Sequence, residues 1–288
     1  MEAHVTPSNI DVHSEDSELD ELSRSDAVAT RADAPSGAPM LEPTEGGLAA
    51  RFAGVVGPNH PIRVFLAAIL GGYALLVALT IAAGFLLTEV LLSIGAVASA
   101  DERISRWLER ERTGTLVDLS WLGSTLAGGV VIPALVGALL VLFLVLRHWR
   151  LAAFTLFVIC VESGTYRATT LVVHRDRPDV ERLEGLPVEA SFPSGHTAAS
   201  VALFGGLLLV LASRIQNTTL KVLLWIAALA IPAFVIWSRM LRGMHHGTDV
   251  TAGVLMGLGA LVVVVFAARA AGAASEHRDS MATKGGAS

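Results

Sequence analysis

The chain has 288 residues, of which 53% are hydrophobic and 16% charged, and its mean hydropathy is +0.60. Because soluble globular domains carry about 25% charged residues, this composition excludes an ordinary soluble enzyme and indicates a membrane protein. The formal net charge is −5, yet the first 50 residues hold eleven acidic and two basic side chains. The rest of the chain is therefore net positive.

The N-terminal part, residues 1–58, is polar and acidic and shows no apolar periodicity. It cannot bury enough surface to offset its conformational entropy, so we predict a disordered acidic tail. It lacks a basic stretch followed by an apolar run, which excludes a cleavable signal peptide.

The body of the chain, residues 59–272, contains long apolar segments. A helix needs about 20 consecutive apolar residues to cross a bilayer. Six segments qualify, near 62–88, 119–146, 151–173, 196–213, 221–241 and 249–270. Lipid offers no partner to an open strand edge, so the sequence predicts an all-α, polytopic membrane protein with six transmembrane helices. Residues 273–288 are expected to form a short C-terminal tail.

Between the first two spans, Ile104, Trp107 and Leu108 recur at helical spacing with charges between them. This pattern favours a short amphipathic helix at the membrane interface. A solvated connector is the alternative.

Three polar clusters interrupt the apolar body: HRDRPDV at 174–180, FPSGHT at 192–197 and SRMLRGMHHGTD at 238–249. The first two join spans three and four and therefore share a membrane face. Spans four and five cross and return, so the third cluster emerges on that same face. The parity of the spans thus predicts one pocket at a membrane surface.

The second cluster reads as the start of a helix, with Ser194 as the expected N-cap. The free N–H groups of Gly195 and His196 would form an anion site. The ring of His196 could protonate a leaving alkoxide.

Arginines and a histidine–carboxylate pair supply the rest of the chemistry. Arg177 can hold phosphate oxygens with two parallel bonds, and Arg175 and Arg239 add charge. His245 and Asp249 are spaced i, i+4, so on a helix they would share a face. The carboxylate would then fix the ring tautomer and leave the other nitrogen free to attack.

The combination of Arg177-Pro178, Pro193-Ser194-Gly195-His196 and Ser238-Arg239-x5-His245-x3-Asp249 resembles the type 2 phosphatidic acid phosphatase superfamily. The resemblance implies metal-independent hydrolysis of a phosphate monoester or diphosphate on a membrane lipid, with a phosphohistidine intermediate and no cofactor. It implies three catalytic residues: His245 as nucleophile, Asp249 as its orienting group and His196 as acid. It implies phosphate binding by Arg177, Arg239, Ser194 and the backbone of Gly195.

One position departs from the family pattern. The family often carries a lysine seven residues before the first arginine, and Thr170 stands there in this chain. Arg175 is expected to bind phosphate and to replace part of the missing charge. The substrate class, a lipid phosphate or isoprenyl diphosphate, includes phosphatidic acid, phosphatidylglycerol phosphate and undecaprenyl diphosphate. Undecaprenyl-diphosphate recycling is a narrower alternative.

Rival functions make different demands on the same residues. A metal-dependent hydrolase could use the histidines and Asp249 as ligands, but the neighbouring arginines favour an oxyanion over a cation. A transporter would place polar groups along a path through the midplane, whereas these gather at one surface. A lipid-binding protein without catalysis is a third alternative.

The expected location is the cell membrane, where the chain is multi-pass. The basic residues that flank the spans are nearly balanced between the two membrane faces. When the arginines assigned to the site are left out of the count, the face that carries the termini has more of them, which favours cytoplasmic termini. The family's site usually faces away from the cytoplasm, so the active site is expected to be extracytoplasmic. Apart from the substrate, the lipid bilayer is the expected partner, and no nucleic acid is expected. The sequence does not determine the oligomeric state.

Overall fold

The computed structural model describes residues 38–185 and 190–285. Within these ranges every regular element is helical, which confirms the predicted all-α class. Residues 1–37, most of the stretch expected to be disordered, lie outside the described residues.

Five helices in the described residues are long and apolar enough to cross a membrane, and a bent pair supplies a sixth span. They confirm the predicted multi-pass architecture. The first is α3 (Pro61–Phe85), continued by the π-helical η2 (Leu86–Leu91). The others are α7 (Trp149–Thr170), the run α8 (Gly195–Ser200), η3 (Val201–Gly205) and α9 (Gly206–Ser213), then α10 (Thr218–Leu241) and α11 (Gly247–Gly285).

The second span, expected as one segment, is two helices: α5 (Gly114–Leu126) and α6 (Val131–Val145), bent by 47°. The break contains Gly128 and Gly129, and glycine disfavours a helix interior because it loses more conformational freedom there than other residues. Pro133 follows in the first turn of α6, where its missing N–H costs no intrahelical bond. The bend lets α5 approach the end of α10.

Helix starts follow local sequence signals. Pro61 begins α3, where its fixed φ suits the first helical position. The side chain of Asn217 accepts a bond from the N–H of Leu220 at the start of α10. Thr113 accepts in the same way from Leu116 at the start of α5. These caps satisfy N–H groups that have no partner inside the helix.

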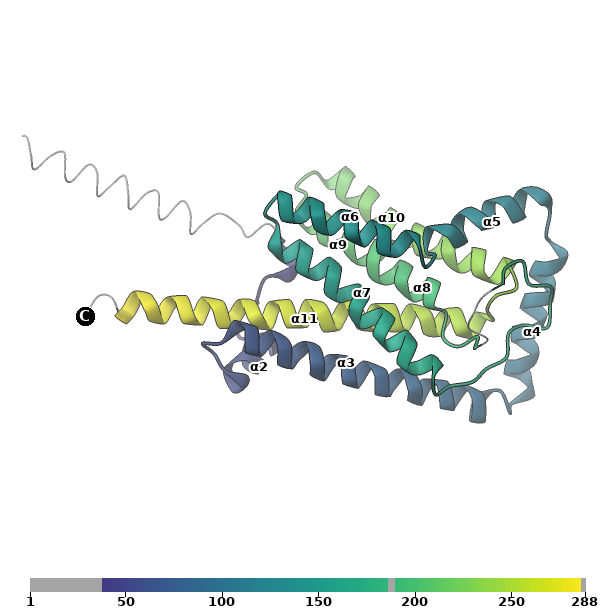
Figure 1. The fold of residues 1–288 in the computed structure, drawn as a ribbon, viewed down its shortest axis with the longest axis horizontal. Helices are drawn as coiled ribbons and strands as arrows, with labels where there is room; N and C mark the ends of the chain where they lie inside the picture. Colours follow the sequence, from purple (N-terminus) through teal and green to yellow (C-terminus); the bar gives the residue numbers. More distant parts are fainter. Residues whose placement is uncertain (1–37, 186–189, 286–288) are drawn as a thin grey trace, which may run out of the picture. The chain divides into compact units, whose positions relative to one another are not determined.

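Helix α11 packs against α3, α2, α7 and α8, and Figure 1 shows it running through the length of the bundle. Close packing on α8 depends on two glycines. A Cβ at Gly253 would lie 2.6 Å from the carbonyl oxygen of Ser194, and one at Gly257 would lie 2.6 Å from that of Ala198. The small residues therefore set the distance between α11 and the second motif, as small residues do between membrane helices.

The segment between the first two spans is helix α4 (Gly95–Arg110). The segment is therefore helical, as predicted, and its place at the membrane interface stays a prediction. Its buried side chains are Asp101, Ser105 and Leu108, while Ile104 and Trp107 are exposed. In Figure 1, α4 crosses the same end of the bundle as the end of α7 and the starts of α8 and α11. All three polar clusters therefore meet beside α4, on the one face that parity predicted.

Both predicted tail boundaries need correction. Residues 38–58, assigned to the disordered tail, contain the short helix η1 (Pro39–Leu41) and helix α2 (Leu48–Val56). Ala49 and Ala53 of α2 are buried against Val64 and Ala270. This apolar packing orders the segment, and its apolar face was not recognised in the sequence because the surrounding residues are polar. The expected C-terminal tail likewise continues α11 as far as Gly285.

Candidate active site

The predicted site residues come together around His245, which lies in the turn between α10 and α11 and is buried. Burial lowers the pKa of His245 well below its usual 6.5, and the nearby charges of Arg239, Arg177 and His196 lower it further. Asp249 acts in the opposite direction. Four predicted residues from three motifs thus act electrostatically on the fifth, and His245 is neutral at physiological pH.

A glycine delivers His245 to this place. Gly243 follows α10 and adopts a φ of +69°, in the region that other L residues avoid. A Cβ there would also lie 2.6 Å from the carbonyl oxygen of Glu181. The turn before His245 therefore requires glycine on both counts.

The ring of His245 is oriented by backbone. Its Nδ1 lies 2.8 Å from the carbonyl oxygen of Ser191. A carbonyl can only accept, so Nδ1 carries the proton and donates it. In the neutral ring Nε2 then holds the free lone pair, which is the tautomer that a nucleophilic histidine needs.

The expected direct pairing of Asp249 with His245 is wrong. Helix α11 begins at Gly247, so His245 precedes the helix and the i, i+4 rule does not apply. Asp249 instead accepts from the backbone N–H of His246 (2.8 Å) and from the hydroxyl of Ser191 (2.6 Å). The first bond is half of a capping box, in which a side chain in the first turn satisfies a free N–H. Asp249 therefore reaches His245 through Ser191.

Arg175 does not take the expected phosphate-binding place. Its Nη1 donates to Asp249 and to the hydroxyl of Thr248 (2.7 Å), and its Nη2 donates to Asp101 at 2.7 Å. Asp101 also accepts from the N–H of Thr248 at 3.2 Å. Arg175 is thus held between two buried carboxylates, and α4 caps the N-terminus of α11 through Asp101.

His246 belongs to the same network. Its Nδ1 lies 3.2 Å from Asp249 and its Nε2 lies 3.2 Å from Glu102 of α4. His246 is thus a hydrogen-bonded packing residue in this position. Two adjacent acids of α4 therefore reach the third motif, one through Arg175 and one through His246.

Ser194 occupies the predicted N-cap position of the fourth span, but its side chain does not cap the backbone. Its hydroxyl pairs instead with that of Thr197 at 2.9 Å. Gly195 faces the ring of Tyr166 on α7: a Cβ there would lie 3.0 Å from a ring carbon. Gly195 thus keeps the helix start close to α7. The first bond of the span runs from Ala198 N to Ser194 O, which leaves the N–H of His196 before that bond available to an anion.

Arg239, near the end of α10, has no exposed surface. Its Nη1 donates to Glu184 at 2.7 Å and to the hydroxyl of Ser124 on α5. Its Nε and Nη2 are buried and have no hydrogen-bond partner among the described residues. Unpartnered buried donors on a cation are costly, so this edge of the guanidinium is suited to an anionic ligand.

Arg177 lies in the loop after α7 and is half-buried. Its Nη1 donates to the carbonyl oxygen of Met244, and its Nη2 donates to that of Ala190 at 3.3 Å. Burial and the nearby charge of Arg239 lower the pKa of Arg177. Thr170, in place of the family's lysine, ends α7 and donates to the carbonyl oxygen of Arg167 at 3.1 Å.

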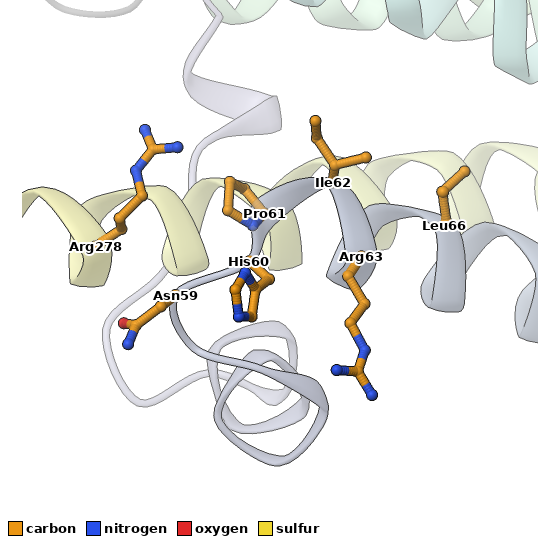
Figure 2. Close-up of a pocket in the computed structure, with 7 residues that line it drawn as sticks. All are labelled: Asn59, His60, Pro61, Ile62, Arg63, Leu66 and Arg278. Atoms are coloured by element: carbon orange, nitrogen blue, oxygen red, sulfur yellow. The ribbon is translucent and has the colours of Figure 1, made fainter.

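Two cavities help to locate the site. One of about 530 Å³ lies over the first motif, and Arg175 and Arg177 are among the residues that line it. Another, of about 710 Å³, lies at the opposite end of the bundle, by the start of α3. Figure 2 shows Arg63 and Arg278 in that second cavity pointing away from one another. Its charges do not converge, and it contains no predicted site residue.

The described parts of the chain hold no group of three or more His, Cys, Asp or Glu side chains arranged to bind a metal ion. His246 and Asp249, two of the candidate ligands, are instead occupied by hydrogen bonds with one another and with Glu102 and Ser191. The donor set around His245 is cationic, as the arginines in the sequence indicated.

Sequence reasoning missed Ser191, Asp101 and Glu184. Asp101 had a readable signal, because it shares the buried stripe of α4 with Ser105 and Leu108, at spacings of four and seven residues. A carboxylate on such a stripe needs a partner. Ser191 and Glu184 lie in an irregular loop, where no periodicity marks them.

Residues 147–272 match the sequence profile of the PAP2 superfamily. The crystal structure of the first transmembrane PAP2 type phosphatidylglycerolphosphate phosphatase from Bacillus subtilis is 25% identical with a TM-score of 0.56, covering 64% of this chain and 94% of that one. The crystal structure of Aquifex aeolicus LpxE is 23% identical with a TM-score of 0.44, covering 57% and 94%. A search of curated proteins found no match.

The chain is therefore a multi-pass membrane protein that resembles the PAP2 superfamily over residues 147–272. Helices α3, α4, α5 and α6 lie outside the matched segment. They nevertheless contribute Asp101, Glu102 and Ser124 to the network around the site.

Proposed function

We propose that the chain is a lipid phosphatase in which His245 takes the phosphoryl group from a membrane lipid and then passes it to water. The match of residues 147–272 to the PAP2 superfamily and the likeness to a phosphatidylglycerolphosphate phosphatase support a lipid phosphatase. The phosphohistidine step is our inference from the site.

One observation carries the proposal: the unpartnered donor edge of Arg239. Its Nε and Nη2 are fully buried, and its charge lowers the pKa of His245. Two donors on one edge of a guanidinium match two oxygens of a phosphate. A buried cation with free donors near a neutral histidine suits phosphoryl transfer, because positioning and charge stabilisation supply most of its catalysis.

In the first step, Nε2 of His245 attacks the phosphorus, a P–N bond forms and the bond from phosphorus to the lipid oxygen breaks. His196 enters this step as the imidazolium and gives its proton to the departing oxygen, which leaves its ring neutral. In the second step, water attacks phosphorus and passes a proton to His196, the P–N bond breaks, and inorganic phosphate leaves with His245 restored. We assign to Arg177, Ser194 and the backbone of Gly195 the binding of the remaining phosphate oxygens.

The substrate is an amphiphile whose chains stay in the bilayer, since the site lies at one end of the membrane spans (Figure 1). We place it among lipid phosphate monoesters and isoprenyl diphosphates. We also propose that the protein lies in the cell membrane, with the end that carries α2 and Gly285 in the cytoplasm and the site outside. Because that end and the motifs lie at opposite ends of the bundle (Figure 1), a cytoplasmic position of the one places the other outside.

The experiment is phosphate release by the purified protein in detergent, with phosphatidic acid, phosphatidylglycerol phosphate and an isoprenyl diphosphate supplied in turn. Wild type should release phosphate from at least one of them, and His245→Ala should lose at least about 1,000-fold, as removal of a nucleophile does. His277→Ala, an exposed residue at the far end of α11, is the matched control. Equal rates for His245→Ala and wild type would refute the mechanism.

A further inference from the structure

Glu184 lies outside the three motifs, yet its carboxylate contacts Arg239, the buried arginine of the third motif. Its Oε2 accepts from Nη1 of Arg239 at 2.7 Å, and its Oε1 accepts from Nε of Arg242. Its side chain is 20% exposed, whereas that of Arg239 is fully buried. One carboxylate thus joins the predicted phosphate ligand Arg239 to a second arginine that the motif leaves unspecified.

The second arginine is itself fixed. Arg242 is buried, and its Nη1 donates to the hydroxyl of Ser120 at 3.1 Å and its Nη2 to the carbonyl oxygen of Leu183 at 3.2 Å. Arg242 therefore lies against α5 and cannot swing freely to a ligand. Through it, Glu184 is held at a defined place beside Arg239.

The bonding pattern of Arg239 shows which edge Glu184 occupies. Glu184 and Ser124 share Nη1 alone, while Nε and Nη2 remain without a partner among the described residues. A carboxylate that mimicked the substrate would pair with the donors that phosphate needs. Glu184 leaves those donors free and holds the guanidinium from the other side.

We propose that Glu184 is a positioning residue: with Ser124, it fixes the guanidinium of Arg239 so that the Nε–Nη2 edge meets the transferred phosphate. This inference rests on the proposed function. The carboxylate is ionised throughout the working range, because Arg239 and Arg242 lower its pKa to about 2 although burial alone would raise it. Such support keeps an active-site group within the narrow range of geometry that catalysis tolerates.

The test compares Glu184→Gln with Glu181→Gln, a control of the same residue type in the same loop, whose side chain is 77% exposed. Glutamine keeps the size of Glu184 but offers one oxygen and one NH2 group, so one of the two arginines loses its acceptor. We expect kcat to fall at least about 10-fold with KM changed less than about 3-fold, since displacement of a catalytic group by about 1 Å can cost 100-fold. Glu181→Gln should keep the wild-type kcat.

Two results would overturn the proposal. A lower KM with an unchanged or higher kcat would make Glu184 a competitor of the substrate phosphate, and unchanged values of both would leave it no role. If Glu184→Gln does not fold, Ser124→Ala replaces it, because the Ser124 hydroxyl supports the same Nη1. This variant should lower kcat by a smaller factor in the same direction, and an unchanged kcat would again contradict the proposal.

A readout without turnover separates this inference from the proposed function. Orthovanadate imitates a phosphoryl group in transfer, and its binding can be followed by calorimetry in detergent. Glu184→Gln should bind vanadate at least about 5-fold more weakly than wild type and Glu181→Gln, because binding of a transferring phosphoryl group depends on the fixed donors. Vanadate binding that is unchanged in Glu184→Gln would contradict the inference, even if the enzyme hydrolyses lipid phosphates. Absence of phosphate release from wild type would instead refute the proposed function.

Discussion

Nδ1 of His245 donates to the carbonyl oxygen of Ser191 at 2.8 Å, and the Ser191 hydroxyl donates to Asp249 at 2.6 Å. The histidine is therefore oriented by backbone, and the carboxylate acts on it through one intervening residue. This relay separates two roles that a direct histidine–carboxylate pair combines. Orientation of the ring belongs to Ser191, and the negative charge belongs to Asp249.

Ser191→Ala tests that relay. The variant keeps the carbonyl that orients His245 but removes the bond to Asp249, and a hydrogen bond to a charged group contributes about 1.5–3 kcal/mol. We expect kcat for phosphate release to fall about 10-fold or more. Ser280→Ala, at the exposed end of α11, should match wild type. A wild-type kcat for Ser191→Ala would show that Asp249 does not act through this residue.

The pH dependence of kcat/KM follows from the state of His245. Its pKa is held well below 6.5 by burial and by Arg239, and protonation removes the lone pair that attacks. Activity therefore declines only when the pH falls toward this lowered pKa, so the acidic limb should lie below pH 6.5. Stability carries the same sign: the neutral buried ring stabilises the fold above pH 6.5, and this contribution is lost on acidification. An acidic limb above pH 6.5 would contradict the assignment of His245.

Asp101 is predicted to support the site from α4. Asp101→Ala removes the acceptor of Arg175 Nη2 and of the Thr248 N–H. Because loss of one partner leaves a buried charge incompletely paired, we expect the free energy of unfolding to fall by about 3 kcal/mol. The measurement is denaturation in detergent, with Asp118→Ala, an exposed acid on α5, as control. Equal stability of the two variants would mean that α4 does not anchor the third motif.

Close packing of α11 on α8 can be tested with one methyl group. A Cβ at Gly253 meets the backbone of Ser194 at 2.6 Å, whereas one at Gly137 of α6 meets nothing within 4 Å. We expect Gly253→Ala to cost about 1–3 kcal/mol of stability through overpacking and to lower phosphate release. Gly137→Ala should be neutral or slightly stabilising. If Gly253→Ala had the melting temperature of Gly137→Ala, the described contact between the helices would be wrong.

Much of the fold could be predicted from sequence because hydrophobic length and parity are strong constraints in a membrane. Apolar runs gave the spans, and parity alone put the three motifs on one face. The bend at Gly128 was missed because the run stays apolar across the break. Helix α2 was missed because it is short, so only its packing against Val64 and Ala270 stabilises it.

The sequence predicted which residues form the site better than it predicted the hydrogen bonds between them. The i, i+4 spacing of His245 and Asp249 indicated a shared helix face, but the helix begins two residues after His245. Arg175 was assigned to phosphate because it is a cation near the motif. In the structure its guanidinium instead donates to Asp101, 74 residues earlier in the chain. Such partners are distant in sequence, and no local pattern reports them.

The most direct test of the account is to trap the phosphoryl group on the protein. Wild type is mixed with a lipid phosphate labelled with ³²P, quenched at alkaline pH within milliseconds and digested for mass spectrometry. The account predicts an acid-labile phosphate on the peptide that contains His245, and no label in His245→Ala. Label on another residue, or turnover without any labelled protein under conditions that trap a phosphohistidine standard, would contradict it.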